Sequence, residues 1–180
     1  MKSSRVTLRS PAEIAQAREA GHLAARVLHM ITPHVQPGVS TEALDRLCHD
    51  YIVNELQVTP ANVGYLGYPK TVCTSVNHVI CHGIPSPGQV LKAGDIINID
   101  VAIIKDGWFG DTSRMYFVGE PSPLARRLVD TTYEAMCAGI AQVRPGATLG
   151  DVGHAIQSVA HREKFSVVRE YCGHGIGQVY

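Results

Sequence analysis

Apolar residues near the start of the chain recur at helical spacing. Ser10, followed by Pro11 and by Glu13 three positions on, forms a capping box with proline at the first helical position. The pattern predicts a helix over about 11–33, and Ser40 is expected to cap a second one. The apolar stripes of the two helices contain Ile14, Leu23, Val27, Met30 and Ile31 in the first, and Leu44, Leu47, Tyr51 and Ile52 in the second.

After the second helix the pattern changes to the alternation typical of β-strands. Three strands are predicted, over 71–85, 95–104 and 108–118. Asp106 and Gly107 are expected to form a tight turn between the last two strands. This part of the chain is therefore predicted to be an antiparallel meander.

The helical pattern then returns. Ser122 and Pro123 are expected to open a third helix, and Thr148 with Asp151 three positions on is expected to cap a fourth. The order of elements in the second half therefore resembles that in the first.

A short motif supports this repetition. Residues 34–40 (HVQPGVS) and 142–148 (QVRPGAT) share a Val-x-Pro-Gly core between two predicted helices. The alternative is that Pro-Gly is simply a common turn sequence between helices. We interpret the chain as a single α+β domain, 1–180, with a first pseudo-repeat at 11–118 and a partial second one at 119–180.

Composition and charge narrow the classes of function. The chain has 180 residues, with 16 Lys and Arg against 16 Asp and Glu, and so shows no electrostatic signal for nucleic acid or an anionic membrane. Its five cysteines contain no Cys-x-x-Cys pair, which favours reduced thiols. No apolar stretch approaches the length of a membrane span. We expect a cytoplasmic protein.

Two carboxylates stand out within the predicted strands. If Asp106-Gly107 is a two-residue turn, Asp100 faces Ser113 and Asp111 faces Ala102 across the hairpin. The two aspartates are then diagonal neighbours on one face, with β-carbons about 7–8 Å apart or less. A one-residue bulge would separate them, and solvated strand acids are the alternative. Because their neighbours are apolar, we interpret the pair as a metal site.

Two histidines lie beside glycine, His82 in CHGIP and His174 in CGHGIG. Two Asp oxygens and one imidazole suit Mn, Fe(II), Co or Zn better than Ca, and leave the site open. In hydrolytic two-metal sites the cations lower the pKa of water and polarise the scissile carbonyl. A further histidine can then hydrogen-bond the substrate, a role that His82 fits.

Several segments together carry a resemblance to a known family. In order, these are GYPKTVCTSVN (67–77), CHGIP (81–85), INIDV (97–101), KDGWFGDTSRM (105–115) and FSVVREYCGHGIG (165–177). The chain resembles the bacterial type I methionine aminopeptidases from about residue 11 to its last residue. This resemblance implies the α+β pita-bread fold, a pseudo-two-fold pair of helix and strand units.

The resemblance also implies roles for the candidate residues. Asp100, Asp111 and His174 correspond to ligands of two divalent metal ions (Co, Mn, Fe(II) or Zn), and His82 to a residue that contacts the substrate near the scissile bond. The implied activity is removal of the initiator methionine when the second residue is small. The implied partners are N-terminal methionyl peptides and nascent chains, met at the ribosome, and the complete enzyme is expected to be a monomer.

Further residues correspond to the substrate pocket and to a cation loop. Tyr65, Tyr68 and Cys73 resemble the wall of the pocket for the methionine side chain. Asn77 and the backbone of Val79 resemble a loop that binds a monovalent cation, Na or K.

Two features depart from the family pattern. Asn62 stands where close relatives often have a cysteine, so the pocket is expected to be more polar there. The family also has a histidine and two glutamate ligands beyond the position of Tyr180. The chain is therefore expected to be a C-terminally truncated fragment that holds at most one metal ion weakly and has little activity.

Other functions remain alternatives at this point. A non-catalytic protein-binding module on the same fold is the main one. A thiol hydrolase using Cys81 or Cys172 would leave the aspartate pair without a role. Proline-directed aminopeptidases share a similar ligand scheme, but the motifs at 67–73 and 81–85 favour methionine.

Overall fold

The chain forms two compact units in the computed structural model, which describes residues 7–180. The first unit contains the described residues up to Glu120 together with Gly175–Tyr180, and the second is Pro121–His174. Residues 1–6 of the predicted domain lie outside the described part.

The first helix, α1 (Pro11–Ile31), begins at the predicted capping box. The Ser10 hydroxyl accepts from the Glu13 backbone N–H, and the Glu13 carboxylate accepts from the Ser10 N–H at 2.7 Å. These hydrogen bonds lower the pKa of Glu13. The predicted stripe is wrong at Ile14, whose side chain is 48% exposed, because the buried part of α1 starts only at Ala20.

The second helix, α2 (Thr41–Asp50), is capped by Ser40 as predicted and continues into a π-helical turn, Tyr51–Glu55. Leu44 is fully buried, whereas Leu47 lies at the edge of the stripe and is 36% exposed. The buried stripe of α2 in the structure is therefore narrower than the stripe predicted from the sequence.

The sheet is built around its longest inner strand. This strand, β3 (Ile96–Lys105), pairs along its whole length with β4 (Trp108–Phe117), and it pairs with β1 (Thr59–Pro60) and β2 (Val72–Val76) on its other side. All pairs are antiparallel, so the predicted meander is confirmed.

The first predicted strand is too long. β2 ends at Val76, and 77–95 is a connection without a named strand. Asn77 has a positive φ of 53°, which turns the chain out of the strand. Its N–H donates to the Ile96 carbonyl and its Oδ1 accepts from the Ile96 N–H, so the turn is fastened to the start of β3.

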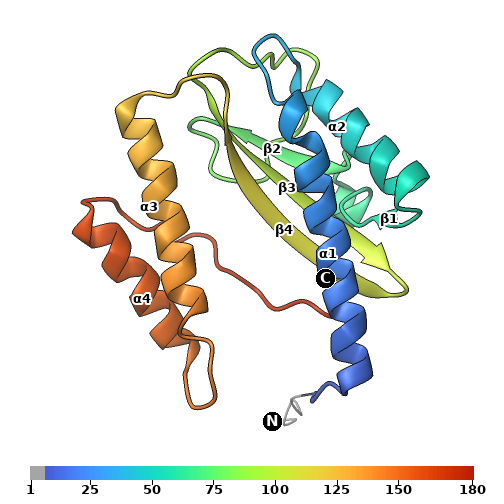
Figure 1. The fold of residues 1–180 in the computed structure, drawn as a ribbon, viewed down its shortest axis with the longest axis vertical. Helices are drawn as coiled ribbons and strands as arrows, with labels where there is room; N and C mark the ends of the chain where they lie inside the picture. The colour runs from blue at the N-terminus through green and yellow to red at the C-terminus, as the bar shows by residue number, and fades with distance from the viewer. Residues whose placement is uncertain (1–6) are drawn as a thin grey trace. The chain divides into compact units, whose positions relative to one another are not determined.

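One face of the sheet is covered by α1, which crosses β3 and β4 (Figure 1). Gly110 permits this contact, because a Cβ there would lie 2.2 Å from the Ala20 carbonyl oxygen of α1. Tyr116 of β4 donates its hydroxyl to the Leu28 carbonyl at 2.7 Å. The alternate residues of β3 on this covered face are completely buried: Ile97, Ile99, Val101 and Ile103.

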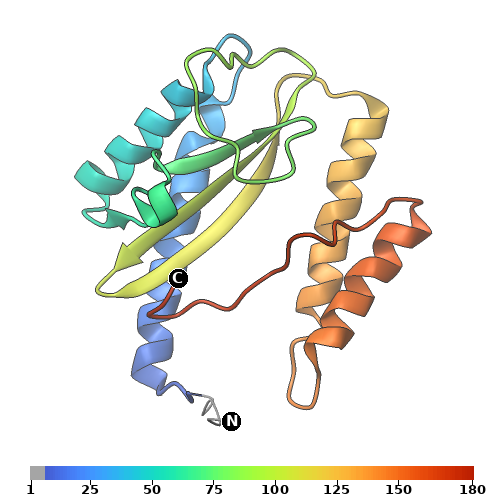
Figure 2. The same ribbon diagram turned by 180° about the vertical axis from the view of Figure 1, so that it is seen from behind.

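The second unit contains a helical hairpin of α3 (Pro123–Ile140) and α4 (Leu149–Arg162), which lie side by side in Figures 1 and 2. Gly139 allows their close approach, because a Cβ there would lie 2.8 Å from the Ile156 side chain. The predicted caps are present at Ser122 and at Thr148. Among residues 7–180, no helix is long and apolar enough to cross a membrane.

The two Pro-Gly turns have the same local geometry. Gly38 and Gly146 both have a φ of 88°, and each turn leads to a hydroxyl-capped helix. This likeness supports the predicted repeat. Its boundaries at 118 and 119 stay a prediction.

Substitution of Gly110 tests the packing of α1 on the sheet. The added Cβ of Gly110→Ala would clash with the backbone of α1, which cannot move aside as a flexible side chain can. We therefore expect this substitution to lower the free energy of unfolding by about 1–3 kcal/mol. Gly21→Ala is the control, since nothing lies within 4 Å of its added Cβ, and helix propensity predicts a gain of up to about 1 kcal/mol. Urea unfolding at 25 °C measures both, and equal effects would contradict this packing.

Candidate metal centre

The two aspartates have the cross-strand register that a two-residue turn at Asp106-Gly107 requires. Asp100 pairs with Ser113 and Asp111 pairs with Ala102, so no bulge separates them. Asp106 and Gly107 both have positive φ, the geometry of the expected hairpin turn. Both carboxylates therefore lie on the face of the sheet opposite to that covered by α1, the face turned to the viewer in Figure 2.

The negative charge of this pair acts on neighbouring side chains. Cys73 pairs with Asp100 across β2 and β3, and its side chain is buried. Burial, reinforced by the carboxylates of Asp100 and Asp111 and opposed by a hydrogen bond with Tyr68, raises the pKa of the Cys73 thiol to about 11. The same two carboxylates add to burial in raising the pKa of Tyr180. A site with this excess of negative charge fits a divalent cation.

The pair alone is not a complete ligand set. Across residues 7–180, no group of three or more His, Cys, Asp and Glu side chains is gathered so that it could hold a metal ion. His174, the third predicted ligand, is the last residue of the second unit and is exposed. Its part in a metal site stays a prediction.

His82 lies in the connection between β2 and β3, with a positive φ of 56°. The next residue, Gly83, fastens it to β2: its N–H donates to the Ser75 hydroxyl, and its carbonyl accepts from the Thr74 N–H at 2.8 Å. A Cβ at Gly83 would lie 2.1 Å from the Thr74 oxygen. Gly83 therefore allows the backbone of this connection to lie close to the backbone of β2. The sharp turn itself is made by His82, which stays exposed.

The predicted pocket residues gather near the same strand. The Tyr68 hydroxyl lies 3.0 Å from the Val72 carbonyl oxygen and 3.1 Å from that of Gly83. It also hydrogen-bonds with Cys73, and burial raises its pKa. Tyr65 lies in a short 3-10 turn of the preceding loop and is 45% exposed. Tyr68 and Cys73 thus touch directly, and Tyr65 lies in the adjoining loop.

The predicted cation loop has a structural role of its own. The Asn77 Nδ2 donates to Asp95 at 2.8 Å, while the Val79 N–H donates to the Val76 carbonyl. Binding of a monovalent cation there stays a prediction.

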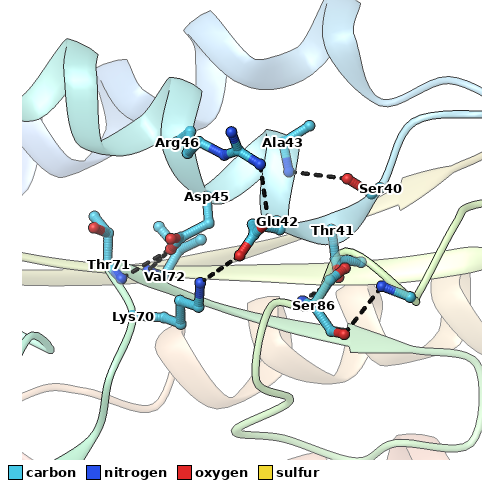
Figure 3. A network of polar contacts seen from close by, with 11 residues as sticks. Ser40, Thr41, Glu42, Ala43, Asp45, Arg46, Lys70, Thr71, Val72 and Ser86 are labelled. Atoms are coloured by element: carbon cyan, nitrogen blue, oxygen red, sulfur yellow. Dashed lines mark hydrogen bonds and ion pairs between the residues drawn. The ribbon is translucent and has the colours of Figure 1, made fainter.

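A buried carboxylate that the sequence analysis did not single out supports the pocket. Asp45 of α2 accepts from the N–H groups of Thr71 and Val72 at 2.8 and 3.0 Å, at the start of β2 (Figure 3). Beside it, a half-buried Glu42 pairs with Lys70 and Arg46. Its position beside Leu44 on the helix could be read from the sequence, but its partners at the start of β2 could not.

An aromatic cluster was also missed. The ring of Tyr180 stacks on Phe109 with centroids 5.1 Å apart and meets Tyr65 edge-on at 4.8 Å. Its hydroxyl donates to the Asn62 Oδ1 at 2.9 Å, and the Asn62 Nδ2 donates to the Thr71 carbonyl. Both polar groups of the Asn62 side chain thus form hydrogen bonds within the protein. The pocket is therefore less polar at this position than the sequence analysis expects. Phe109 could have been found, since it is two residues before Asp111 and shares its face.

An antiparallel sheet with helices on one face and paired carboxylates on the other is the α+β pita-bread arrangement of metallopeptidases. The chain belongs to metallopeptidase family M24, whose sequence profile matches residues 15–180.

Two curated relatives show how far the similarity extends. Methionine aminopeptidase from Escherichia coli strain K12 is 54% identical over 173 residues, which are 96% of this chain and 66% of that protein. The methionine aminopeptidase of Rickettsia prowazekii strain Madrid E is 52% identical over 175 residues, 97% of this chain and 67% of that one. The chain thus spans about two thirds of the length of these relatives.

Solved structures agree with this assignment. The crystal structure of methionine aminopeptidase from Rickettsia prowazekii matches with a TM-score of 0.94 at 52% identity, covering 97% of this chain and 70% of that one. The Xaa-Pro dipeptidase from Bacillus anthracis, at 21% identity and a TM-score of 0.79, shares the fold over 96% of this chain and 47% of its own. The predicted family and fold are confirmed.

Substitution of Asp45 tests the support of β2. Because two backbone N–H groups would lose a charged acceptor, we expect Asp45→Ala to lower the free energy of unfolding by about 2–4 kcal/mol. Glu42→Ala is the control on the same helix and should cost clearly less, since it removes ion pairs between side chains and leaves no backbone N–H without an acceptor. Urea unfolding compares the two, and equal losses would show that Asp45 has no special role.

The burial of two thiols gives a separate prediction. Burial raises the pKa of Cys48 to about 12 and that of Cys73 to about 11, so at pH 8 only roughly 0.1% of the Cys73 thiol is ionised. We expect both to stay unreactive towards Ellman's reagent in the native protein, while the exposed Cys137 and Cys172 react fast.

The urea-unfolded chain, in which all five thiols react, provides the reference. Cys137→Ser and Cys172→Ser variants assign the fast signals. Native Cys73 reacting as fast as Cys137 would contradict the described burial.

Proposed function

We propose that the protein removes the N-terminal methionine from peptides and nascent proteins whose second residue is small. The observation that carries this proposal is the Asp100–Asp111 pair, placed on one face of the sheet beside Cys73. The names of relatives that are 52–54% identical over nearly the whole chain support it.

Each named residue has a task in this proposal. Asp100 and Asp111 hold divalent cations with their carboxylates, and His174 contributes an imidazole. The cations, when bound, supply a lowered pKa for water and Lewis-acid polarisation of the scissile carbonyl. His82, exposed at its turn, hydrogen-bonds the substrate beside the scissile bond. Tyr65, Tyr68 and Cys73 enclose the methionine side chain.

The donor set favours particular metal ions. Carboxylate oxygens with imidazole favour Mn, Fe(II), Co or Zn, and Asn77 with Val79 forms the proposed Na or K loop. The proposed partners are N-terminal methionyl peptides and nascent chains at the ribosome, in the cytoplasm.

Metal binding tests the proposal directly. In calorimetric titration with Mn²⁺, we expect Asp111→Asn to weaken binding by about 100-fold or more, because a close charge pair near a protein surface is worth several kcal/mol. Asp106→Asn is the matched control: it makes the same chemical change in the exposed hairpin turn and should bind as the wild type does.

A peptide assay tests the substrate. We expect methionine release from Met-Ala-Ser, at whatever rate the chain reaches with Mn²⁺, to fall to background with Asp111→Asn but not with Asp106→Asn. Equal binding and release by the two variants would exclude the carboxylate pair as the metal site.

A further inference from the structure

Arg9 connects the start of α1 to a segment that is far away in the sequence. Its Nη1 donates to the Glu13 carboxylate at 3.2 Å and to the Gln178 Oε1 at 3.3 Å. Its guanidinium also lies over the ring of Trp108, 5.0 Å from the ring centroid. One side chain thus contacts the first turn of α1, the start of β4 and the returning segment Gly175–Tyr180.

The capping box of α1 holds Arg9 in its position. The Glu13 Oε2 accepts from both the N–H and the hydroxyl of Ser10, while the Glu13 Oε1 accepts from Arg9. Because Arg9 directly precedes the capping residue, one carboxylate fixes both the helix start and the guanidinium. Arg9 is therefore oriented by local structure, independently of its contact with Gln178.

The returning segment is held most closely at Gly177, which is buried. The Gly177 carbonyl accepts from the Phe109 N–H at 2.8 Å. A Cβ on Gly177 would lie 3.2 Å from the Arg9 Nη2 and 4.0 Å from the Trp108 ring. Gly177 is therefore in direct contact with both side chains, and its lack of a side chain permits this close approach.

Tyr180, three residues beyond Gly177, lies next to the proposed methionine pocket. Its ring stacks on Phe109 and meets Tyr65 edge-on. Its hydroxyl donates to the Asn62 Oδ1 at 2.9 Å. Because so few residues separate Gly177 from Tyr180, fixing Gly177 against β4 limits where the Tyr180 ring can lie.

We propose that Arg9 is a positioning residue, which clasps Gly177 and Gln178 against β4 and thereby keeps the Tyr180 ring in place as a wall of the methionine pocket. Arg9 acts through Tyr180 and does not itself touch the substrate. The consequence for the pocket rests on the proposed function, whereas the clasp itself does not.

Amide hydrogen exchange of the full chain, followed by NMR, tests the clasp without metal or substrate. We expect Arg9→Ala to make the Phe109 N–H exchange about fivefold faster, because the contacts that hold its acceptor are lost. The Val118 N–H, which donates to the Asp95 carbonyl just beyond the other end of β4, should keep its wild-type rate. Arg18→Ala, an exposed position of α1, is the matched control and should change neither rate. An unchanged Phe109 rate would overturn the inference.

Trp108 is the single tryptophan of the chain, so its fluorescence reports the same contact. It is only 2% exposed. We expect Arg9→Ala to raise the acrylamide quenching constant about twofold, and Arg9→Lys, which keeps a cation over the ring, to raise it less. Wild-type quenching in Arg9→Ala would overturn the clasp. Equal acceleration of exchange at Phe109 and Val118 would do the same, since it would show a general loss of stability.

Steady-state release of methionine from Met-Ala-Ser with Mn²⁺ tests the consequence for the pocket. We expect Arg9→Ala to raise KM about threefold and Tyr180→Ala at least as much, with kcat within about twofold, because a pocket wall binds ground and transition states alike. The double variant should have the KM of Tyr180→Ala alone, since Arg9 acts through Tyr180. Independent, multiplying effects would overturn this route. No methionine release by the wild type would overturn the proposed function, whereas the Phe109 exchange rate would still decide the clasp.

Discussion

The register of the β3–β4 hairpin is the constraint on which the candidate site depends. Because side chains alternate between the faces of a strand, a shift of one residue would move Asp111 to the face covered by α1. There its carboxylate would be buried among isoleucines without a partner, at a large cost in free energy. The two-residue turn at Asp106-Gly107 and the close packing of α1 on Gly110 both fix the same register. The site and the core thus specify one alignment.

Features that rest on local chemistry could be predicted from the sequence. The capping boxes at Ser10 and Thr148, the Asp-Gly turn and the pairing of Asp100 with Ser113 all follow from residues close together in the chain. The end of β2 could not be predicted, because residues 77–85 keep an alternating apolar pattern while the positive φ of Asn77 ends the strand. Pattern alone does not reveal such a conformation.

Contacts between distant residues escaped prediction for a different reason. Asp45 reads as an ordinary acidic residue of an amphipathic helix until its two N–H partners at the start of β2 are known. The polarity of Asn62 could be noticed, but its partner is 118 positions away. Such pairings depend on how the chain folds back, which neither spacing nor composition reports.

The first unit is discontinuous in the sequence, since Gly175–Tyr180 returns to it only after the whole of the second unit. The Gly177 carbonyl accepts from the Phe109 N–H at 2.8 Å, and so caps part of the outer edge of β4. During synthesis the hairpin with both aspartates therefore emerges well before the segment that borders this edge of β4. The entropy cost of closing the loop between β4 and residue 175 grows only slowly with the length of that loop. The long separation in sequence therefore adds little to the free energy of bringing the two segments together. The hairpin with its charged residues is thus made before the segment that covers this edge of β4.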